Sequence, residues 1–148
     1  MGQQEEKKRV LFLCTHNSAR SQMAEGLMNT LYGDRFEAYS AGTEPTEVSP
    51  YAVAVMKELG IDISSQRPKS VKHFLGETFD YVITICDQAK EACPFFPGAK
   101  QRMHRGFEDP AHVQGTEAET FGRFRRVRDE LSTWLAETFG DGAIGIDS

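Results

Sequence analysis

The residues best suited to chemistry lie near the start of the chain, where an apolar run ends in a cysteine. Val10 to Leu13 are typical of a buried strand, and Arg20 stands six positions after Cys14. A short turn between a strand and a helix directs backbone N–H groups inward, and the helix N-terminus adds a positive dipole. Arg20 adds a planar fork that can hold two anion oxygens, while the same positive field favours the thiolate form of Cys14. The pattern predicts a site that binds a tetrahedral oxyanion and attacks it.

The residues around Cys14 and Arg20 have the types expected of an oxyanion-binding loop. Asn17 carries an amide that can tie the turn together, and Ser21 carries a hydroxyl that can donate its proton to the thiolate. An ordinary loop residue and a helix N-cap are the simpler interpretations of these two positions. A buried core residue is the alternative for Cys14, but the arginine and the helical pattern that follow favour a nucleophile. The predicted loop residues are Thr15, His16, Asn17, Ser18, Ala19 and Ser21.

The rest of the chain alternates strand-like apolar runs with segments of helical periodicity, separated by Gly or Pro. This order predicts an α/β fold, with a single three-layer domain, a central four-stranded parallel sheet and helices on both faces. Ligands bind such sheets at the carboxyl ends of the strands, where the Cys14 loop lies. The expected strands span residues 8–13, 36–40, 79–86 and 99–104. The expected helices span residues 18–32, 49–59 and 120–139, with flexible tails at 1–7 and 140–148.

Length and composition restrict the class of protein. The 148 residues are 39% hydrophobic and 26% charged, which suits one globular domain over residues 1–148. A net charge of -5 argues against nucleic acid or an anionic membrane surface as partner. No apolar run reaches the ~18 residues of a membrane span, and no signal peptide is recognisable, so we expect a cytoplasmic protein. The 3 cysteines are then reactive or buried thiols rather than a disulfide framework.

A second pair of thiols, Cys86 and Cys93, also suggests chemistry. No CxxC pair occurs and the histidines are scattered, so we expect no metal site. Cys86 ends a predicted parallel strand at the same sheet edge as Cys14, so these two thiols can approach each other. If residues 86 to 93 form a helix, the ends are about 10 Å apart, and a disulfide between them requires the segment to unwind. Two unrelated buried cysteines are the alternative.

The dipeptide Asp109-Pro110 supplies a candidate proton donor. On its own such a dipeptide is most often a turn, but beside a cysteine nucleophile its carboxyl group is suited to protonate a leaving oxygen. Glu108 is the neighbouring competitor for this role. His104 and His112 are further acids, although nothing in the sequence fixes them to the site and a surface or core histidine is the simpler interpretation.

These motifs together resemble the low-molecular-weight tyrosine phosphatase superfamily, and specifically its thioredoxin-coupled arsenate reductases. The resemblance runs nearly end to end along the chain. Its most specific part is the pair Cys86 and Cys93, which matches the redox pair that separates the reductases from the phosphatases. The segments that carry the resemblance are Cys14 to Gly26, Tyr39 to Gly42, Val82 to Cys86, Cys93-Pro94 and Asp109-Pro110.

Two departures from the phosphatases favour a reductase further. The phosphatases usually carry a second cysteine inside the nucleophile loop, where Ala19 stands here or next to it. They also carry aromatic residues after Asp-Pro that clasp a phosphotyrosine ring, whereas this chain has Ala111-His112.

The resemblance implies a low-molecular-weight phosphatase-like fold and the reduction of arsenate to arsenite. In the implied mechanism Arg20 and the loop bind arsenate, Cys14 attacks arsenic, and Asp109 protonates the departing hydroxyl. Cys86 then attacks the Cys14 sulfur and arsenite leaves. Cys93 next moves the disulfide to Cys86–Cys93, which thioredoxin reduces. The implied enzyme is a monomer that needs no bound cofactor and binds phosphate or sulfate as analogues of arsenate.

Two other functions are compatible with the same residues. A low-molecular-weight tyrosine phosphatase would hydrolyse phosphate monoesters through a Cys14 phosphoenzyme, using Arg20 and Asp109 in the same roles without Cys86 or Cys93. A non-catalytic anion-binding or redox-sensor protein would need no leaving-group acid.

Some thioredoxin-coupled arsenate reductases hold potassium beside the nucleophile loop, and the resemblance implies a corresponding region here. Its members are Asn17, Glu25, Ser40 and Lys69, with the lysine at a position where those reductases have an aspartate. An ammonium group can occupy the place of the metal ion, and a potassium site would then lack a ligand and suffer charge repulsion. The simpler interpretation is an exposed Lys69 that only solvates a loop.

Overall fold

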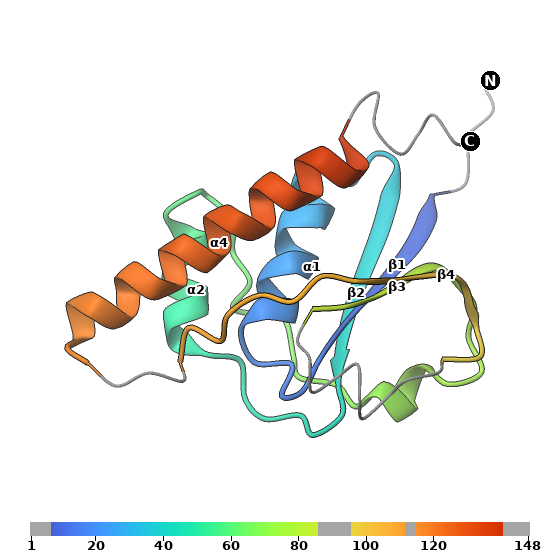
Figure 1. Ribbon diagram of the computed structural model, residues 1–148, viewed down its shortest axis with the longest axis horizontal. Helices are drawn as coiled ribbons and strands as arrows, with labels where there is room; N and C mark the ends of the chain where they lie inside the picture. The colour runs from blue at the N-terminus through green and yellow to red at the C-terminus, as the bar shows by residue number, and fades with distance from the viewer. Residues whose placement is uncertain (1–6, 86–95, 112–114, 141–148) are drawn as a thin grey trace.

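The computed structural model describes residues 7–85, 96–111 and 115–140. Four strands form one parallel sheet in the order β2-β1-β3-β4, and the long helix α4 crosses α1 and α2 (Figure 1). The elements are β1 Lys8–Cys14, α1 Arg20–Leu31, β2 Phe36–Gly42, α2 Pro50–Lys57, the 3-10 helix η1 Val71–Phe74, β3 Phe79–Thr84, β4 Ala99–His104 and α4 Glu117–Phe139. The predicted single α/β domain with a four-stranded parallel sheet is confirmed.

The two faces of the sheet are covered by different helices. Phe36 and Tyr39 lie three positions apart on β2, so their side chains point to opposite faces. Phe36 packs edge-on against Phe139 of α4, with ring centroids 5.2 Å apart. Tyr39 packs against Phe74 of η1, with centroids 5.8 Å apart. The helices α1, α2 and α4 pack against one another, so among the described elements it is the short helix η1 that covers the second face.

Strand β1 lies in the middle of the sheet because its residues are apolar on both sides. Val10 to Leu13 are completely buried, as expected for a central parallel strand. The register pairs Cys14 with Gly42, and Leu13 with Thr84, so the carboxyl ends of three strands meet beside the loop that follows β1.

Several predicted boundaries shift by a few residues in the structure. Helix α1 begins at Arg20 rather than at residue 18, because Ala19 has a non-helical backbone with a φ of -128°. Helix α4 begins at Glu117 rather than at residue 120, because Thr116 and Glu119 form a capping box. Strand β3 ends at Thr84, two residues earlier than predicted.

Other expectations concern the remaining parts of the chain. Ser49 caps α2 by accepting hydrogen bonds from the N–H groups of Tyr51 and Ala52, in agreement with the predicted Ser-Pro start of this helix. Most of the two predicted tails, and Cys86 and Cys93, lie outside the described residues. Of the helices in the described ranges, none combines the length and the hydropathy that crossing a membrane requires.

Candidate active site

The loop from Cys14 to Arg20 is held by the segment that follows β2. Four loop carbonyls accept hydrogen bonds from N–H groups of residues 43–49, and all described peptide bonds are trans. In a trans peptide unit the N–H points opposite to the C=O, so the N–H groups of residues 15, 16, 17 and 19 face away from this segment, toward the inside of the loop. This is the arrangement of an anion-binding nest. The four bonds run from Thr43 to Cys14 at 3.3 Å, Glu44 to Thr15 at 2.8 Å, Thr46 to His16 at 2.9 Å and Ser49 to Ser18 at 2.9 Å.

Asn17 fixes the turn of the loop. It is completely buried, and its left-handed φ of 51° is one that asparagine tolerates better than most residues. Its Nδ2 donates to Ser21 Oγ at 2.8 Å, and its Oδ1 accepts from the backbone N–H of Lys69 at 2.7 Å. Its carbonyl accepts from Gln22 Nε2 at 2.9 Å. These hydrogen bonds agree with a tying role for Asn17, and they add Gln22, a residue that the sequence pattern does not single out.

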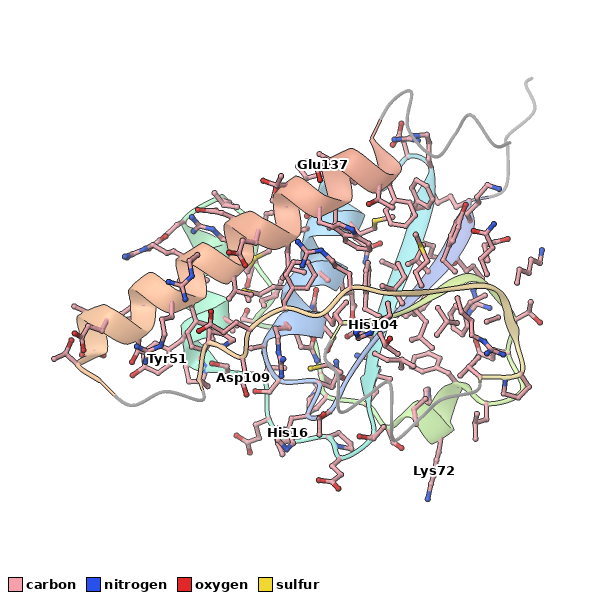
Figure 2. All side chains as sticks on the ribbon, in the orientation of Figure 1. His16, Tyr51, Lys72, His104, Asp109 and Glu137 are labelled. Carbon is pink, nitrogen blue, oxygen red and sulfur yellow. The ribbon has the colours of Figure 1, made fainter. Side chains whose placement is uncertain are left out.

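Cys14, Arg20 and Asp109 line one cavity. Cys14 is 2% exposed at the end of β1, and the cavity measures about 550 Å³. Three of its lining residues, Tyr51, Asp109 and His16, follow one another along the lower left part of the view in Figure 2. The lining residues are Cys14, His16, Ser18, Ala19, Arg20, Thr46, Glu47, Val48, Ser49, Pro50, Tyr51, Asp109 and Ala111.

Arg20 links the nucleophile loop to the loop of Asp109. Its buried guanidinium donates through Nη1 to the carbonyl oxygen of Phe107 at 2.9 Å, and its Nη2 lies 3.7 Å from Asp109 Oδ2. Asp109 Oδ1 accepts from the N–H of Ala111 at 3.0 Å. These contacts fix the plane of the guanidinium and hold a partly exposed carboxyl group at the mouth of the cavity.

The structure separates the candidate acids that the sequence left as competitors. Asp109 lines the cavity, whereas Glu108 forms an ion pair with Arg126 of α4 at 2.9 Å. His104, at the end of β4, places its Nδ1 2.7 Å from Thr84 Oγ1 and does not line the cavity. His112 lies outside the described residues. Of the acids that the sequence predicts and the structure describes, Asp109 is therefore the one that lines the cavity.

The four residues of the implied cation region form one connected cluster, which includes Asn17 of the loop itself. Ser40 Oγ donates to Glu25 Oε1 at 2.5 Å, and Lys69 Nζ lies 3.8 Å from the same oxygen. Burial raises the pKa of Glu25, partly offset by the Ser40 hydrogen bond and the positive charge of Lys69. Burial lowers the pKa of Lys69, because it disfavours the charged ammonium group. The negative charge of Glu25 partly offsets this effect. Asn17 joins this cluster through the backbone N–H of Lys69.

Gly42 ends the segment Tyr39 to Gly42, which carries part of the family resemblance, and the structure shows why this position is a glycine. It pairs with Cys14 in the sheet, and a Cβ at this position would lie 2.6 Å from the carbonyl oxygen of Thr15 and 2.9 Å from the amide nitrogen of Asn17. Both atoms belong to the backbone of the loop, so they cannot move aside without displacing it. Gly42 is therefore required by the close approach of β2 to the loop.

We expect Gly42→Ala to destabilise the protein by ~1–3 kcal/mol, because overpacking shifts the backbone of the loop. Equilibrium unfolding in urea measures this change, and the affinity for inorganic phosphate is expected to fall with it. Gly122→Ala is the matched control, because a Cβ there meets nothing within 4 Å and lies on helix α4. That control is expected to gain ~0.5–1 kcal/mol. Equal stabilities of Gly42→Ala and the unchanged protein would contradict the proposed close contact.

Comparison with known proteins agrees with this geometry. Residues 9–139 match the family described as low molecular weight phosphotyrosine protein phosphatase. The chain is 50% identical to an arsenate reductase of Halalkalibacterium halodurans over 135 residues, which cover 91% of this chain and 96% of that protein. It is 47% identical to an arsenate reductase of Bacillus subtilis over 132 residues, which cover 89% and 95% of the two chains.

Solved structures show the same fold. An arsenate reductase in the phosphate binding state superimposes with a TM-score of 0.74 at 34% identity, covering 86% of this chain and 93% of that one. A low molecular weight protein tyrosine phosphatase from T. tengcongensis gives a TM-score of 0.71 at 30% identity, covering 87% and 95%. The chain belongs to the low molecular weight phosphotyrosine protein phosphatase family. Its relatives named here include both arsenate reductases and a phosphatase, so the reaction has to be argued from the site.

Proposed function

We propose that this protein reduces arsenate to arsenite and is regenerated by thioredoxin. The observation that carries the proposal is the placement of Cys14, Arg20 and Asp109 around one cavity, in a chain that is 50% identical to an arsenate reductase. The inward N–H groups of the loop suit a tetrahedral oxyanion, and phosphate is the anion named for a related arsenate reductase structure.

The first half of the proposed reaction forms a bond between sulfur and arsenic. Arg20 and the loop N–H groups bind the arsenate oxygens, and the Cys14 thiolate attacks arsenic. Asp109 donates a proton to the oxygen that leaves as water. The Asn17 amide donates to Ser21 Oγ, so the Ser21 hydroxyl proton is left to stabilise the thiolate.

The second half of the proposed reaction transfers two electrons to arsenic. The Cys86 thiolate attacks the Cys14 sulfur, the sulfur–arsenic bond breaks with its electron pair going to arsenic, and arsenite leaves. Cys93 then attacks Cys86, which frees Cys14 and leaves a Cys86–Cys93 disulfide for thioredoxin to reduce. The described backbone supports an approach of Cys86 to Cys14. The residues that immediately precede them are hydrogen-bonded to each other, because the N–H of Ile85 donates to the carbonyl of Leu13 at 3.0 Å.

An assay of the purified protein tests the proposal directly. It contains arsenate, thioredoxin, thioredoxin reductase and NADPH, and it follows NADPH oxidation together with arsenite release. We expect NADPH oxidation that depends on arsenate and on thioredoxin, with arsenite released in equal amount. Hydrolysis of an aryl phosphate without arsenate-dependent NADPH oxidation would instead identify a phosphatase.

The phosphatase is the second candidate because the nucleophile loop, Arg20 and Asp109 suit phosphate esters equally well. Phosphate and arsenate share shape and charge, so the loop alone does not distinguish them. The residue after Asp109-Pro110 is Ala111, and it lines the cavity where a phosphatase carries an aromatic side chain to clasp a phosphotyrosine ring. This small side chain weakens the case for a tyrosine phosphatase.

We expect Arg20→Lys to reduce kcat/KM for arsenate by ~10²–10³-fold, because an ammonium group does not reproduce the bidentate geometry of the guanidinium. Steady-state kinetics measure this loss, and the affinity for inorganic phosphate is expected to fall in parallel. Arg126→Lys is the matched control, since Arg126 is half exposed on α4 and pairs with Glu108. The control is expected to retain full activity. An Arg20→Lys variant as active as this control would remove Arg20 from oxyanion binding.

A further inference from the structure

We infer that the ammonium group of Lys69 takes the place of a metal cation behind the nucleophile loop, so that the loop is supported by a charge belonging to the chain itself. The inference concerns the stability and anion affinity of the loop. Those two properties can be measured whether or not the proposed reduction of arsenate is correct.

The backbone of Lys69 is fixed on both sides, which determines where its side chain begins. Its N–H donates to Asn17 Oδ1 at 2.7 Å, and its carbonyl accepts from the N–H of Gly42 at 2.8 Å. Ser70 continues this contact as a parallel bridge to Gly42. Lys69 is therefore held between the loop and the end of β2, unlike the freely solvated lysine that its sequence position also suggests.

The side chain of Lys69 turns toward a carboxylate that requires compensation. Glu25 is 15% exposed at its side chain, and Lys69 Nζ lies 3.8 Å from its Oε1. The same ammonium donates to the carbonyl oxygen of Arg67 at 2.6 Å. A carboxylate removed from water to this degree is costly unless an opposite charge lies close to it, and Lys69 supplies that charge.

A metal cation does not fit the residues that are present. A bound potassium ion needs several oxygens to replace its hydration shell. Asn17 Oδ1 already accepts the N–H of Lys69, and Glu25 Oε1 already accepts the hydroxyl of Ser40. The lysine adds a positive charge where a cation would need a further oxygen, so a second cation would be repelled. The implied potassium site is therefore replaced in this chain by the pair of Lys69 and Glu25.

The link to the anion site runs through Asn17. The residue that carries the ammonium also holds the Asn17 side chain, and Asn17 in turn holds Ser21 and the left-handed turn of the loop. Loss of the ion pair leaves Glu25 without an opposite charge and loosens the segment that fixes this turn. Lys69 is thus a positioning residue that acts on the oxyanion through the loop.

Thermal melting of the full-length protein in potassium and in sodium chloride, at equal ionic strength, tests the replacement. We expect the unchanged protein to have the same Tm in both salts. Lys69→Met is expected to lower the Tm, and Lys69→Asp is expected to create a Tm that rises specifically with potassium, because a carboxylate oxygen then stands beside Glu25. Lys72→Met is the matched control and is expected to melt like the unchanged protein, because Lys72 is exposed and points away from the body of the molecule (Figure 2).

Binding of inorganic phosphate, measured by calorimetry, supplies a second readout that does not require Lys69→Asp to fold. We expect Lys69→Met to weaken phosphate binding by ~10-fold, because the loop N–H groups that bind the anion lose the support of this ion pair. Lys69→Arg, which keeps the positive charge, is expected to recover most of that loss. A potassium-specific rise in the Tm of the unchanged protein would overturn the inference. So would a Lys69→Met variant that matches Lys72→Met in both Tm and phosphate affinity.

Discussion

Replacing Cys14 by serine is expected to abolish both arsenate reduction and any hydrolysis of phosphate esters, with a loss of ~10³-fold or more. The reason is that the N–H groups of the loop and the Arg20 guanidinium can favour a thiolate at neutral pH, but they cannot ionise a serine hydroxyl. Release of arsenite in a single turnover and hydrolysis of an aryl phosphate measure the two reactions separately. Both losses follow from the one nucleophile that the two chemistries share.

The Cys14→Ser variant also tests whether the cavity binds anions independently of the nucleophile. Serine is close to cysteine in size, and residue 14 is 2% exposed, so we expect the fold and the Tm to be retained. Binding of inorganic phosphate should persist, because Arg20 and the loop N–H groups remain in place. Substantial residual activity in a variant that binds phosphate normally would show that Cys14 is not the nucleophile.

The second large effect concerns Cys86 and Cys93. We expect replacement of either by serine to stop multiple turnover with arsenate, because both thiols are needed to return Cys14 to its reduced form. The two variants should differ in a single turnover. Cys86→Ser is expected to release no arsenite, since nothing attacks the Cys14–arsenic adduct, whereas Cys93→Ser should release a single arsenite per enzyme molecule. Arsenite measured after rapid mixing with arsenate distinguishes these outcomes.

Slow hydrolysis of an aryl phosphate is the internal control for both thiol variants. This reaction requires Cys14, Arg20 and Asp109 but neither additional thiol, so it should continue in each variant. Thioredoxin-dependent cycling that is undiminished in Cys93→Ser would mean that thioredoxin attacks the first disulfide directly. The transfer to Cys93 would then be wrong, although reduction of arsenate would still stand.

The sequence and the structure agree most closely where the signals are local. The apolar run before Cys14 predicts the buried strand β1, and the Ser-Pro start of α2 is confirmed by the hydrogen bonds to Ser49. Apolar periodicity predicts a start for α1 that is two residues too early, since it does not reveal the non-helical backbone of Ala19. The same periodicity predicts a start for α4 that is three residues too late, because the first turn after the Thr116 capping box is mostly polar.

The sequence by itself determined the nucleophile loop, the arginine that follows it, the alternation of strands and helices, and the resemblance that connects Asp109 with Cys14. These features depend on residue types at short spacings, and the family match agrees with them. The roles of Cys86 and Cys93 also come from the sequence, and they remain predictions.

Only the tertiary structure decided how the loop is supported. The hydrogen bonds from residues 43–49 to the loop carbonyls, and the close approach of Gly42, join backbone segments that are far apart along the chain. The choice between an exposed Lys69 and one paired with Glu25 likewise depends on a contact between residues 44 positions apart, since 69 − 25 = 44. Every residue type except proline can supply a backbone N–H, and every residue type supplies a carbonyl, so such bonds leave almost no mark in the residue pattern. These hydrogen bonds form only when the parallel strands are paired and the ends of β1 and β2 lie side by side.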